Sequence, residues 1–354
     1  MTYDQRLNPS PPHVSVIVPA YNAAATIVGC LHALAGQITS HSYEVIVVDD
    51  GSTDDTARII SGLQSTGYDL RLVTQPHAGA AAARNRGVIE AQGSLLLFTD
   101  ADCEPTSAWI ETLASSLERA DGAKGTYRTR QRSLVARWVQ AEYESKYRRM
   151  AQRPTIDFID TYSAAYRRNV FESAGGFNES LEVDEDQELS FRLAEGGACL
   201  VFVPEAVVYH KHVATPRAYI KRKFRIGYWK VLVAALHPTR IFSDSHTPQS
   251  LKAQMALLAL LLLMLPAAPF SRLARRVAAG SAAALFASAM PITFSIAHHD
   301  PEVALVAPVM NLLRAAGLLT GTMAGLARFG PRLLPRTLST STRGSRIKYN
   351  RSHD

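Results

Sequence analysis

Two carboxylates, Asp100 and Asp102, stand one residue apart directly after the apolar segment 94–99. The segment is typical of a buried strand, so both acids are expected at its carboxyl end, where ligands bind in an open α/β sheet. A carboxylate pair in this position can hold a hard divalent cation, and the cation can hold a diphosphate. An Asp-x-Asp pair is equally typical of a solvated turn. The neighbouring segments therefore have to distinguish the two interpretations.

A second acidic strand end occurs at Asp49 and Asp50, which follow the apolar segment 44–48. Carboxylates at two strand ends can face the same crevice of a sheet. Asp50 can accept hydrogen bonds from a nucleobase or a ribose there, and Gly51 permits a tight turn beside it. Segment 52–54 is also typical of a helix cap, and the two roles are compatible.

Acidic residues return at Glu185 and Asp186, at the start of a helical pattern. A carboxylate within hydrogen-bond reach of a hydroxyl can act as a general base, and Asp186 is the candidate. A first-turn acid also compensates a helix dipole without any catalytic role. His210 and His212 follow a strand pattern and point to the same side of an extended segment. Either histidine is a candidate metal ligand or a structural side chain.

Short apolar runs alternate with helical patterns in the amino-terminal half of the chain. This alternation predicts an α/β fold with a mostly parallel sheet that is covered on both faces. Segment 106–150 is expected to be largely helical and polar, and segment 155–213 to mix strands with helices. The predicted strands are 14–18, 44–48, 70–73 and 95–98, and the predicted helices are 26–35, one through 59–63, and 80–90.

The carboxyl-terminal part has a different character. Segment 216–236 mixes Arg and Lys with aromatic residues, which is typical of an amphipathic helix at a membrane surface and also of an ordinary docking helix. Three apolar segments follow, at 253–270, 277–297 and 303–327. A membrane-spanning helix needs about 20 apolar residues, so all three are candidates. A buried helical bundle is the alternative.

Charges around these segments predict a topology. Arginines lie at 272–276, an acidic link lies at 298–302, and the tail beyond 327 is basic. The positive-inside rule places both basic segments in the cytoplasm, together with the α/β domain. We therefore expect the first apolar segment, which contains prolines, to dip into the membrane and return. The second and third segments would then span it.

Composition excludes several classes of protein. The formal net charge is +7, and beyond Asp244 the only acidic residues are Asp300, Glu302 and Asp354. A basic and apolar region of this kind favours anionic lipid over nucleic acid as a partner, and the sequence has no nucleic-acid-binding motif. The three scattered cysteines predict neither a disulfide framework nor a zinc site. The amino terminus has no signal-peptide pattern, so we expect the α/β domain in a reducing compartment.

Six motifs, taken in order, resemble those of the family 2 glycosyltransferases, which have a GT-A fold. The resemblance covers residues 13–213 and implies a Rossmann-like, mostly parallel sheet, followed here by an amphipathic helix and transmembrane helices. The motifs are Val16–Asn22, Val48–Asp54, Gly79 with Ala83–Gly87, Asp100–Asp102, Ala174–Glu179, and Glu185–Asp186 with Leu189 and Arg192.

The resemblance implies a binding site for a nucleotide-diphosphate sugar, UDP- or GDP-linked. Pro19, Tyr21 and Asp50 match the nucleobase pocket. Arg84 matches the basic residue near the nucleotide, and Asp100 matches a contact to the ribose or the metal.

The same resemblance implies a metal site and a catalytic base. Asp102 matches the main ligand of Mg²⁺ or Mn²⁺, and His210 matches a further metal contact. Asp186, in a catalytic motif with Glu185 and Arg192, matches the base of an inverting single displacement. The acceptor would be a lipid-linked or saccharide hydroxyl close to membrane lipid, with the catalytic domain on the cytoplasmic side of the cytoplasmic membrane.

Other activities fit less well. A dinucleotide-dependent oxidoreductase or a P-loop NTPase would carry glycine motifs that this sequence lacks. A sugar-nucleotide pyrophosphorylase would carry a Gly-rich phosphate loop near the first strand. An inactive, membrane-anchored sugar-nucleotide-binding protein is the alternative from another class. The expected domains are a disordered lead 1–12, a GT-A domain 13–213, an interfacial linker 214–250, a membrane region 251–330 and a basic cytoplasmic tail 331–354.

Overall fold

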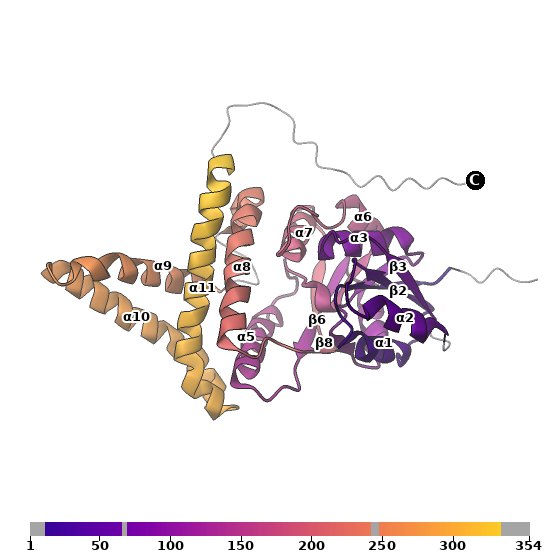
Figure 1. Cartoon of the computed structure of the whole chain (residues 1–354), viewed down its shortest axis with the longest axis horizontal. Helices are drawn as coiled ribbons and strands as arrows, with labels where there is room; N and C mark the ends of the chain where they lie inside the picture. The colour runs from indigo at the N-terminus through magenta and orange to yellow at the C-terminus, as the bar shows by residue number, and fades with distance from the viewer. Residues whose placement is uncertain (1–10, 66–68, 242–247, 334–354) are drawn as a thin grey trace, which may run out of the picture.

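The computed structural model describes residues 11–65, 69–241 and 248–333. The expected amino-terminal lead up to residue 10 and the tail beyond 333 lie outside these residues. An α/β domain comes first in the described chain, and a group of long helices follows it (Figure 1).

The α/β domain is built on an eight-stranded sheet of order β3-β2-β1-β4-β7-β6-β8-β5. The first four strands in this order are parallel, as the apolar runs predict, and β1 pairs with both β2 and β4. β7 is antiparallel to β4 and β6, and β5 is antiparallel to β8. The strands are β1 Val14–Ala20, β2 Tyr43–Asp49, β3 Leu70–Thr74, β4 Leu95–Phe98, β5 Cys103–Pro105, β6 Gly122–Arg128, β7 Ala164–Arg167 and β8 Leu200–His210.

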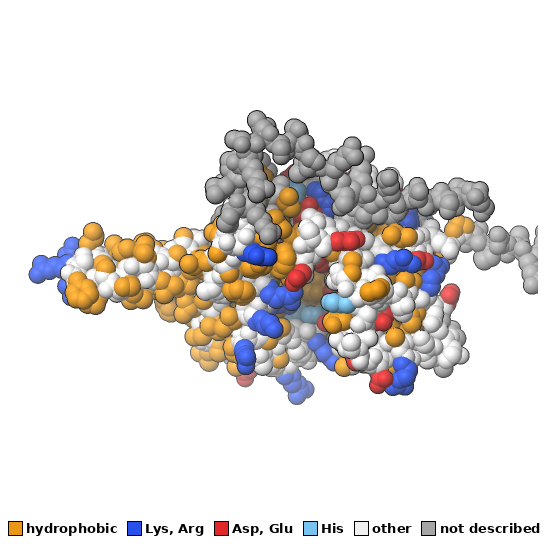
Figure 2. Space-filling model, turned by 45° about the horizontal axis from the view of Figure 1, so that its top comes forward, with side chains coloured by type: hydrophobic (Ala, Val, Ile, Leu, Met, Phe, Trp, Pro, Cys, Tyr) orange, Lys and Arg blue, Asp and Glu red, His pale blue; other side chains and the backbone are white. Residues whose placement is uncertain are grey.

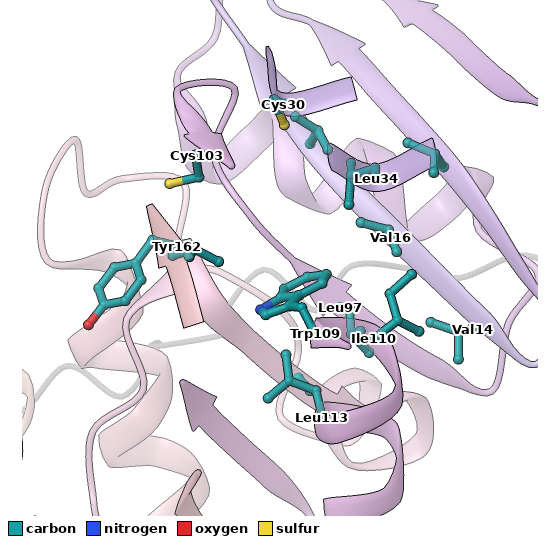
Figure 3. Packing of buried hydrophobic residues seen from close by; sticks show 14 of the residues in the cluster. Val14, Val16, Cys30, Leu34, Leu97, Cys103, Trp109, Ile110, Leu113 and Tyr162 are labelled. Atoms are coloured by element: carbon teal, nitrogen blue, oxygen red, sulfur yellow. The ribbon is translucent and has the colours of Figure 1, made fainter. Parts of the chain in front are cut away.

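Helices cover both faces of the sheet and bury a separate apolar cluster on each. One cluster places Leu31 and Trp109 against the side chains of β1 and β4, and Figure 3 shows Trp109 beside Leu97. The other cluster places Val88 and Phe171 against the opposite face. The helices of this domain are α1 Ile27–Ala35, α2 Thr56–Ser65, α3 Ala80–Glu90, α4 Trp109–Ser116, α5 Leu134–Met150, α6 Arg168–Ser173 and α7 Glu185–Glu195, with a 3-10 turn at Thr161–Ser163.

Strand β6 corrects the expectation that segment 106–150 is largely helical. The strand has no apolar run, because it alternates small residues with the buried Lys124. Gly125 has no room for a side chain, since a Cβ there would lie 2.1 Å from the carbonyl oxygen of Ala206. Close packing therefore determines the position of β6 in the sheet, and a hydrophobicity pattern does not show such packing.

The basic helix expected at 216–236 is α8, Pro216–Leu236, and it pairs with the last helix, α11, Pro301–Leu333 (Figure 1). Gly317, Gly321 and Gly325 recur at every fourth position of α11 and face α8. A Cβ at Gly321 would lie 2.1 Å from the carbonyl oxygen of Phe224. Small residues at this spacing let two helix backbones approach closely. Helix α8 is thus docked on α11 along its length.

The two helices between them, α9 Gln249–Met264 and α10 Arg272–Ala297, form a hairpin that projects away from the α/β domain (Figure 1). A short 3-10 helix, Leu265–Ala267, follows α9. Three segments are each long and apolar enough to cross a membrane: 249–267, 272–297 and 301–330. In the most apolar 18-residue stretch of each, 11%, 17% and 50% of the residues, respectively, are buried. The hairpin therefore exposes most of its apolar surface. Figure 2 shows this apolar surface, with basic side chains at its far end.

The link between α10 and α11 is fastened to the α/β domain. Arg137 of α5 donates from Nε to Oδ2 of Asp300 at 2.8 Å and from Nη1 to Oε2 of Glu302 at 2.8 Å. These ion pairs are incompatible with an acidic link that lies across a membrane from the α/β domain. The expected topology, in which the second and third apolar segments span with this link on the far side, is therefore wrong for this structure.

Candidate active site

A cavity of about 610 Å³ lies between the sheet and α8. Asp100 and Arg84 line its inner wall, and the segment 184–187 at the start of α7 lines its side. Residues of α5 and α8 form the opposite wall, among them Lys146 and Arg222. The strand-end acid Asp100 and the acids Glu185 and Asp186 of α7 therefore face one space, whereas Asp50 and Asp102 do not line it.

A buried arginine joins these two groups of acids. Arg84, 4% exposed, donates from Nη1 to Oε1 of Glu185 at 2.7 Å and from Nη2 to Oδ1 of Asp100 at 2.8 Å. Removing one partner of a buried ion pair leaves an uncompensated charge, which typically costs about 3–5 kcal/mol. Arg84 therefore fixes the position of Asp100 relative to α7 and neutralises part of the negative charge between them.

Asp186 has the electrostatics of a general base. Burial and the neighbouring Glu185 carboxylate raise its pKa to about 7, and Arg84 opposes the rise. One carboxylate oxygen accepts a hydrogen bond from the amide N of Gln187 at 2.7 Å. Burial also raises the pKa of the neighbouring Asp184 to about 8. A base whose pKa lies near neutrality suits proton transfer at physiological pH.

Asp102 lies beside His210 at the end of β8. Oδ2 of Asp102 and Nε2 of His210 are 3.1 Å apart. Burial raises the pKa of Asp102, but the hydrogen bond and charge of His210 outweigh burial, so the pKa lies below its ordinary value. His212 is set further back, because Nε2 of His212 pairs with Oε1 of Gln140 at 3.1 Å.

These residues offer a donor set for a hard divalent cation. Asp100, Asp102 and Cys103 can bring one ligand atom each within 4.8 Å of one another. Burial raises the pKa of the Cys103 thiol, which keeps the thiol protonated and makes it a poor ligand. Carboxylate oxygens are the ligands that Mg²⁺ and Mn²⁺ prefer in proteins, and Asp100 and Asp102 supply them. The residues present therefore fit such an ion.

His77 lies among the residues of the expected nucleobase pocket. Asp50 is buried, and its carboxylate accepts hydrogen bonds from the amides of Ala78 and Gly79 at 2.9 and 2.8 Å. Nδ1 of His77 lies 2.8 Å from the same carboxylate, and its ring stacks on Tyr21 with centroids 4.1 Å apart. Asp50 thus orders the loop 75–79, and a direct contact to a base would displace one of these donors. Tyr21 remains 47% exposed, and Pro19 is half-buried.

Arg192 is placed differently from the expectation. Its guanidinium donates to both carboxylate oxygens of Glu188, at 2.8 and 2.7 Å, and to the carbonyls of Ala174 and Gly176. Arg192 does not line the cavity. The reason is helical periodicity, since residue 192 lies about one and two-thirds turns beyond Asp186 and faces the 174–176 turn. Arg192 is therefore a positioning residue for α7, and its assignment as a catalytic residue is corrected.

Sequence reasoning missed the basic wall opposite the acids. Lys146 on α5 and Lys223 and Lys230 on α8 line the cavity, whereas the sequence indicated for α8 only a helix at a membrane surface or a docking helix. The aromatic floor was also missed, where Tyr127 stacks on His210 with ring centroids 4.6 Å apart. The mixed basic and aromatic pattern of 216–236 was the available signal, but it does not say which face meets the site.

The fold and this site together define a GT-A glycosyltransferase. The same fold occurs in a mannosyltransferase from Pyrobaculum calidifontis, solved in complex with GDP-Man and Mn²⁺. That structure aligns with a TM-score of 0.56 at 21% identity, over 90% of this chain and 88% of the other.

Sequence comparisons identify the family. The profile of glycosyl transferase family 2 matches residues 15–175, and that of glycosyl transferase family group 2 matches residues 122–297. Glycosyltransferase AglE of Haloferax volcanii is 31% identical over 229 residues, which cover 63% of this chain and 74% of AglE. Pre-mycofactocin glycosyltransferase of Mycobacterium tuberculosis is 30% identical over 243 residues, which cover 66% of this chain and 50% of that protein. The chain belongs to glycosyltransferase family 2, whose members transfer a sugar from a nucleotide sugar.

Proposed function

We propose that this enzyme is a membrane-attached, inverting glycosyltransferase in which Asp186 is the general base. The observation that carries the proposal is the buried Asp186 carboxylate, with a pKa raised to about 7, in the same cavity as the strand-end acid Asp100. The hydroxyl acceptor belongs to a lipid-linked or saccharide molecule.

A single displacement accounts for the chemistry with these residues. The acceptor oxygen forms a bond to the anomeric carbon while its proton passes to Asp186. The bond from that carbon to the diphosphate breaks on the opposite face, and the nucleoside diphosphate leaves with the electron pair. One carboxylate is sufficient, because no glycosyl-enzyme intermediate forms. Arg84 holds Asp100 beside Glu185, the chain neighbour of Asp186, at the wall of the same cavity.

Asp102, Asp100 and His210 would hold Mg²⁺ or Mn²⁺. When bound, the ion supplies positive charge to the diphosphate as the negative charge of the leaving group develops. Tyr21 and Pro19 would contact the nucleobase at the edge of the loop that Asp50 orders. A UDP- or GDP-linked sugar is the proposed donor class, in line with the GDP-Man and Mn²⁺ that the Pyrobaculum enzyme binds.

Donor binding is expected to require the metal. In thermal-unfolding measurements on the detergent-solubilised chain, we expect GDP-Man or UDP-GlcNAc to raise the unfolding temperature only with Mn²⁺ present, and Asp102→Asn to abolish the rise. Asp55→Asn is the matched control, because that carboxylate lies on the surface in a pair with Arg58. An equal rise in the presence of a chelator would contradict the proposed metal site.

The pH dependence of the reaction follows from Asp186. The base is active only when deprotonated, and its pKa is about 7. We therefore expect kcat to fall about tenfold per pH unit below this value and to level off above it. Measuring kcat from pH 5 to 9 at saturating donor tests this expectation. A kcat that stays level from pH 5 to 9 would indicate a carboxylate with an ordinary pKa.

For membrane attachment, we propose that the α9–α10 hairpin enters the bilayer while α8 and α11 lie along its surface. The exposed basic residues Arg217, Lys221 and Arg225 keep α8 out of hydrocarbon, and α11 is packed along α8. Between Arg276 and its end at residue 297, α10 extends about 30 Å, which matches the hydrocarbon thickness. Arginines at the hairpin tip oppose the positive-inside rule but can reach the far headgroups.

Cysteine labelling distinguishes the two topologies. We expect Pro269→Cys at the hairpin tip to react with a membrane-impermeant maleimide on intact cells, and His299→Cys in the α10–α11 link to react only after lysis. Both positions are exposed in the structure. A Cys199→Ser background removes the most accessible native thiol, since Cys30 and Cys103 are buried. Labelling of residue 299 on intact cells would restore the topology in which the second and third apolar segments span.

A further inference from the structure

The cavity that contains Asp186 shares a wall with a second cavity of about 310 Å³. Five residues line both spaces: Glu142, Lys146, Lys223, Ile226 and Lys230. They come from α5 and α8, so the wall stands where the α/β domain meets the membrane-associated helices. Figure 2 shows basic side chains gathered in this region, between the apolar hairpin and the α/β domain. The two cavities are therefore neighbours across a basic partition.

The second cavity changes character from one side to the other. Toward α5 it is lined by Arg148 and Arg149 in addition to the lysines of the partition. Toward the hairpin it is lined by Leu251 of α9 and by Pro291 and Ile292 of α10, with small polar residues between them. A charged side next to the active site and an apolar side next to the hairpin suit an amphiphile.

The partition consists of three lysines, Ile226 and one carboxylate. Its one carboxylate, Glu142, lies 3.1 Å from Nζ of Lys223 and 3.1 Å from Nη1 of Arg314. Burial raises the pKa of Glu142, but Lys223 and Arg314 outweigh burial and lower it to about 2, so Glu142 is ionised. Lys146 and Lys230 are the other two lysines of the partition. Burial and the charge of Lys223 hold the pKa of Lys146 well below its ordinary value.

Asp184, directly before α7, lines the active-site cavity together with these lysines. The charges of Lys230 and Lys146 both act on the Asp184 carboxyl, but burial raises its pKa to about 8, so this group is largely protonated at neutral pH. Burial lowers the pKa values of Lys146 and Lys223, and an anion bound beside them would favour their charged forms. Phosphate is the anion that lysines most commonly bind as point charges.

The position of these lysines also relates them to the chemistry. Lys146 and Lys230 are close enough to influence Asp184, which is two residues before Asp186. An anion at the partition would therefore lie next to the acceptor side of the catalytic cavity. The donor diphosphate has its own site, at Asp102 and His210 beyond Asp100.

We propose that the partition formed by Lys146, Lys223 and Lys230 binds the phosphate of a lipid acceptor. The lipid chain leaves through the second cavity toward the α9–α10 hairpin, and a hydroxyl of the headgroup faces Asp186. The ligand class is a phosphate-linked lipid with a hydroxyl-bearing headgroup, either an isoprenyl diphosphate sugar or a glycerophospholipid such as phosphatidylinositol. This inference rests on the proposed function, because it names the acceptor of that reaction.

The test measures lipid and donor binding on the same full-length protein in neutral detergent. The probes are a long-chain isoprenyl diphosphate sugar, phosphatidylinositol and an uncharged glucosyl diacylglycerol, each titrated while thermal unfolding is followed. We expect one of the two phosphate lipids to raise the unfolding temperature, and the uncharged glycolipid to leave it unchanged. The phosphate lipid that binds identifies the source of the ligand.

The variant is Lys146→Gln combined with Lys230→Gln, and the matched control is Arg217→Gln, an exposed cation on α8 outside both cavities. Hydrogen bonds to charged groups contribute enough that we expect the double variant to bind the phosphate lipid about tenfold or more weakly. Arg217→Gln and the double change Lys146→Arg with Lys230→Arg should retain binding.

The two proposals fail differently. Equal binding of the uncharged glycolipid, or unchanged affinity in the glutamine variant, would overturn the phosphate site while Mn²⁺-dependent donor binding persists. If the wild-type protein did not bind the donor in the presence of Mn²⁺, the proposed function itself would be overturned. If the glutamine variant does not fold, as shown by a lost donor response, the comparison of charged and uncharged lipids on the wild-type protein still decides.

Discussion

Asp186→Asn is expected to lower kcat for sugar transfer by about 10²- to 10⁴-fold, the range that a positioned general base contributes. The amide keeps the size of the side chain and loses the ability to take the proton of the acceptor hydroxyl. Donor binding should persist, because the proposed metal ligands Asp102 and His210 lie on other elements of the fold. The measurement is transfer of radiolabelled sugar from the donor into the lipid fraction of membranes that contain the variant.

The control for this substitution is Glu182→Gln, which makes the same chemical change at the rim of the cavity. The Glu182 side chain is 71% exposed and its closest cation, Arg225, is 3.7 Å away. We expect its kcat within about twofold of wild type, since surface ion pairs contribute little. A kcat of Asp186→Asn within threefold of wild type would refute the base assignment. Absence of transfer by the wild-type protein with all donors tested, despite donor binding, would favour the inactive sugar-nucleotide-binding protein.

Arg84→Met should destabilise the protein by about 3–5 kcal/mol, the cost of leaving buried charges without their partner. The methionine fills similar space, but Asp100 and Glu185 would face each other without a cation. We expect thermal unfolding in detergent to occur several degrees lower. The destabilisation should shrink at acidic pH, because protonation of the two carboxylates then removes the uncompensated charge.

Arg86→Met is the matched control on the same helix. Nη2 of Arg86 pairs with Oε1 of Glu90 at 2.6 Å, but the Arg86 side chain is 49% exposed. A pair of this kind in a helix contributes about 0.3–0.5 kcal/mol. Equal destabilisation by the two substitutions would show that the buried bridge is not the dominant contribution of Arg84.

Local patterns were sufficient for the first four strands, because each is an apolar run that ends at a turn. They were insufficient for β6, where Gly125 and Lys124 replace the expected apolar side chains and packing selects the strand. The acidic motifs were found because strand ends and helix starts can be located from sequence. Arg192 was misassigned because motif membership does not show which face of a helix a residue occupies.

In the membrane region, too, the sequence predicted the helices but not how they pack against one another. Length and hydropathy predicted three helices that could cross a bilayer, and the described part of the chain contains three. Their pairing depends on contacts between distant residues. The glycines of α11 meet α8 about a hundred positions earlier in the chain, and Arg137 meets Asp300 163 positions later. No hydropathy window contains both members of such a pair.

The sequence by itself determined the fold class and the family, and it located Asp100, Glu185 and Asp186, which line the cavity. These depend on periodicity and on motifs that are contiguous in the chain. Only the tertiary structure shows that Arg84 joins Asp100 to Glu185. Glu185 lies 101 positions after Arg84 in the chain. The tertiary structure also decided that α8 forms the basic wall opposite those acids and that Arg192 faces away from them. The physical reason is that burial and Coulomb energy depend on distance in space, and distance along the chain does not specify it.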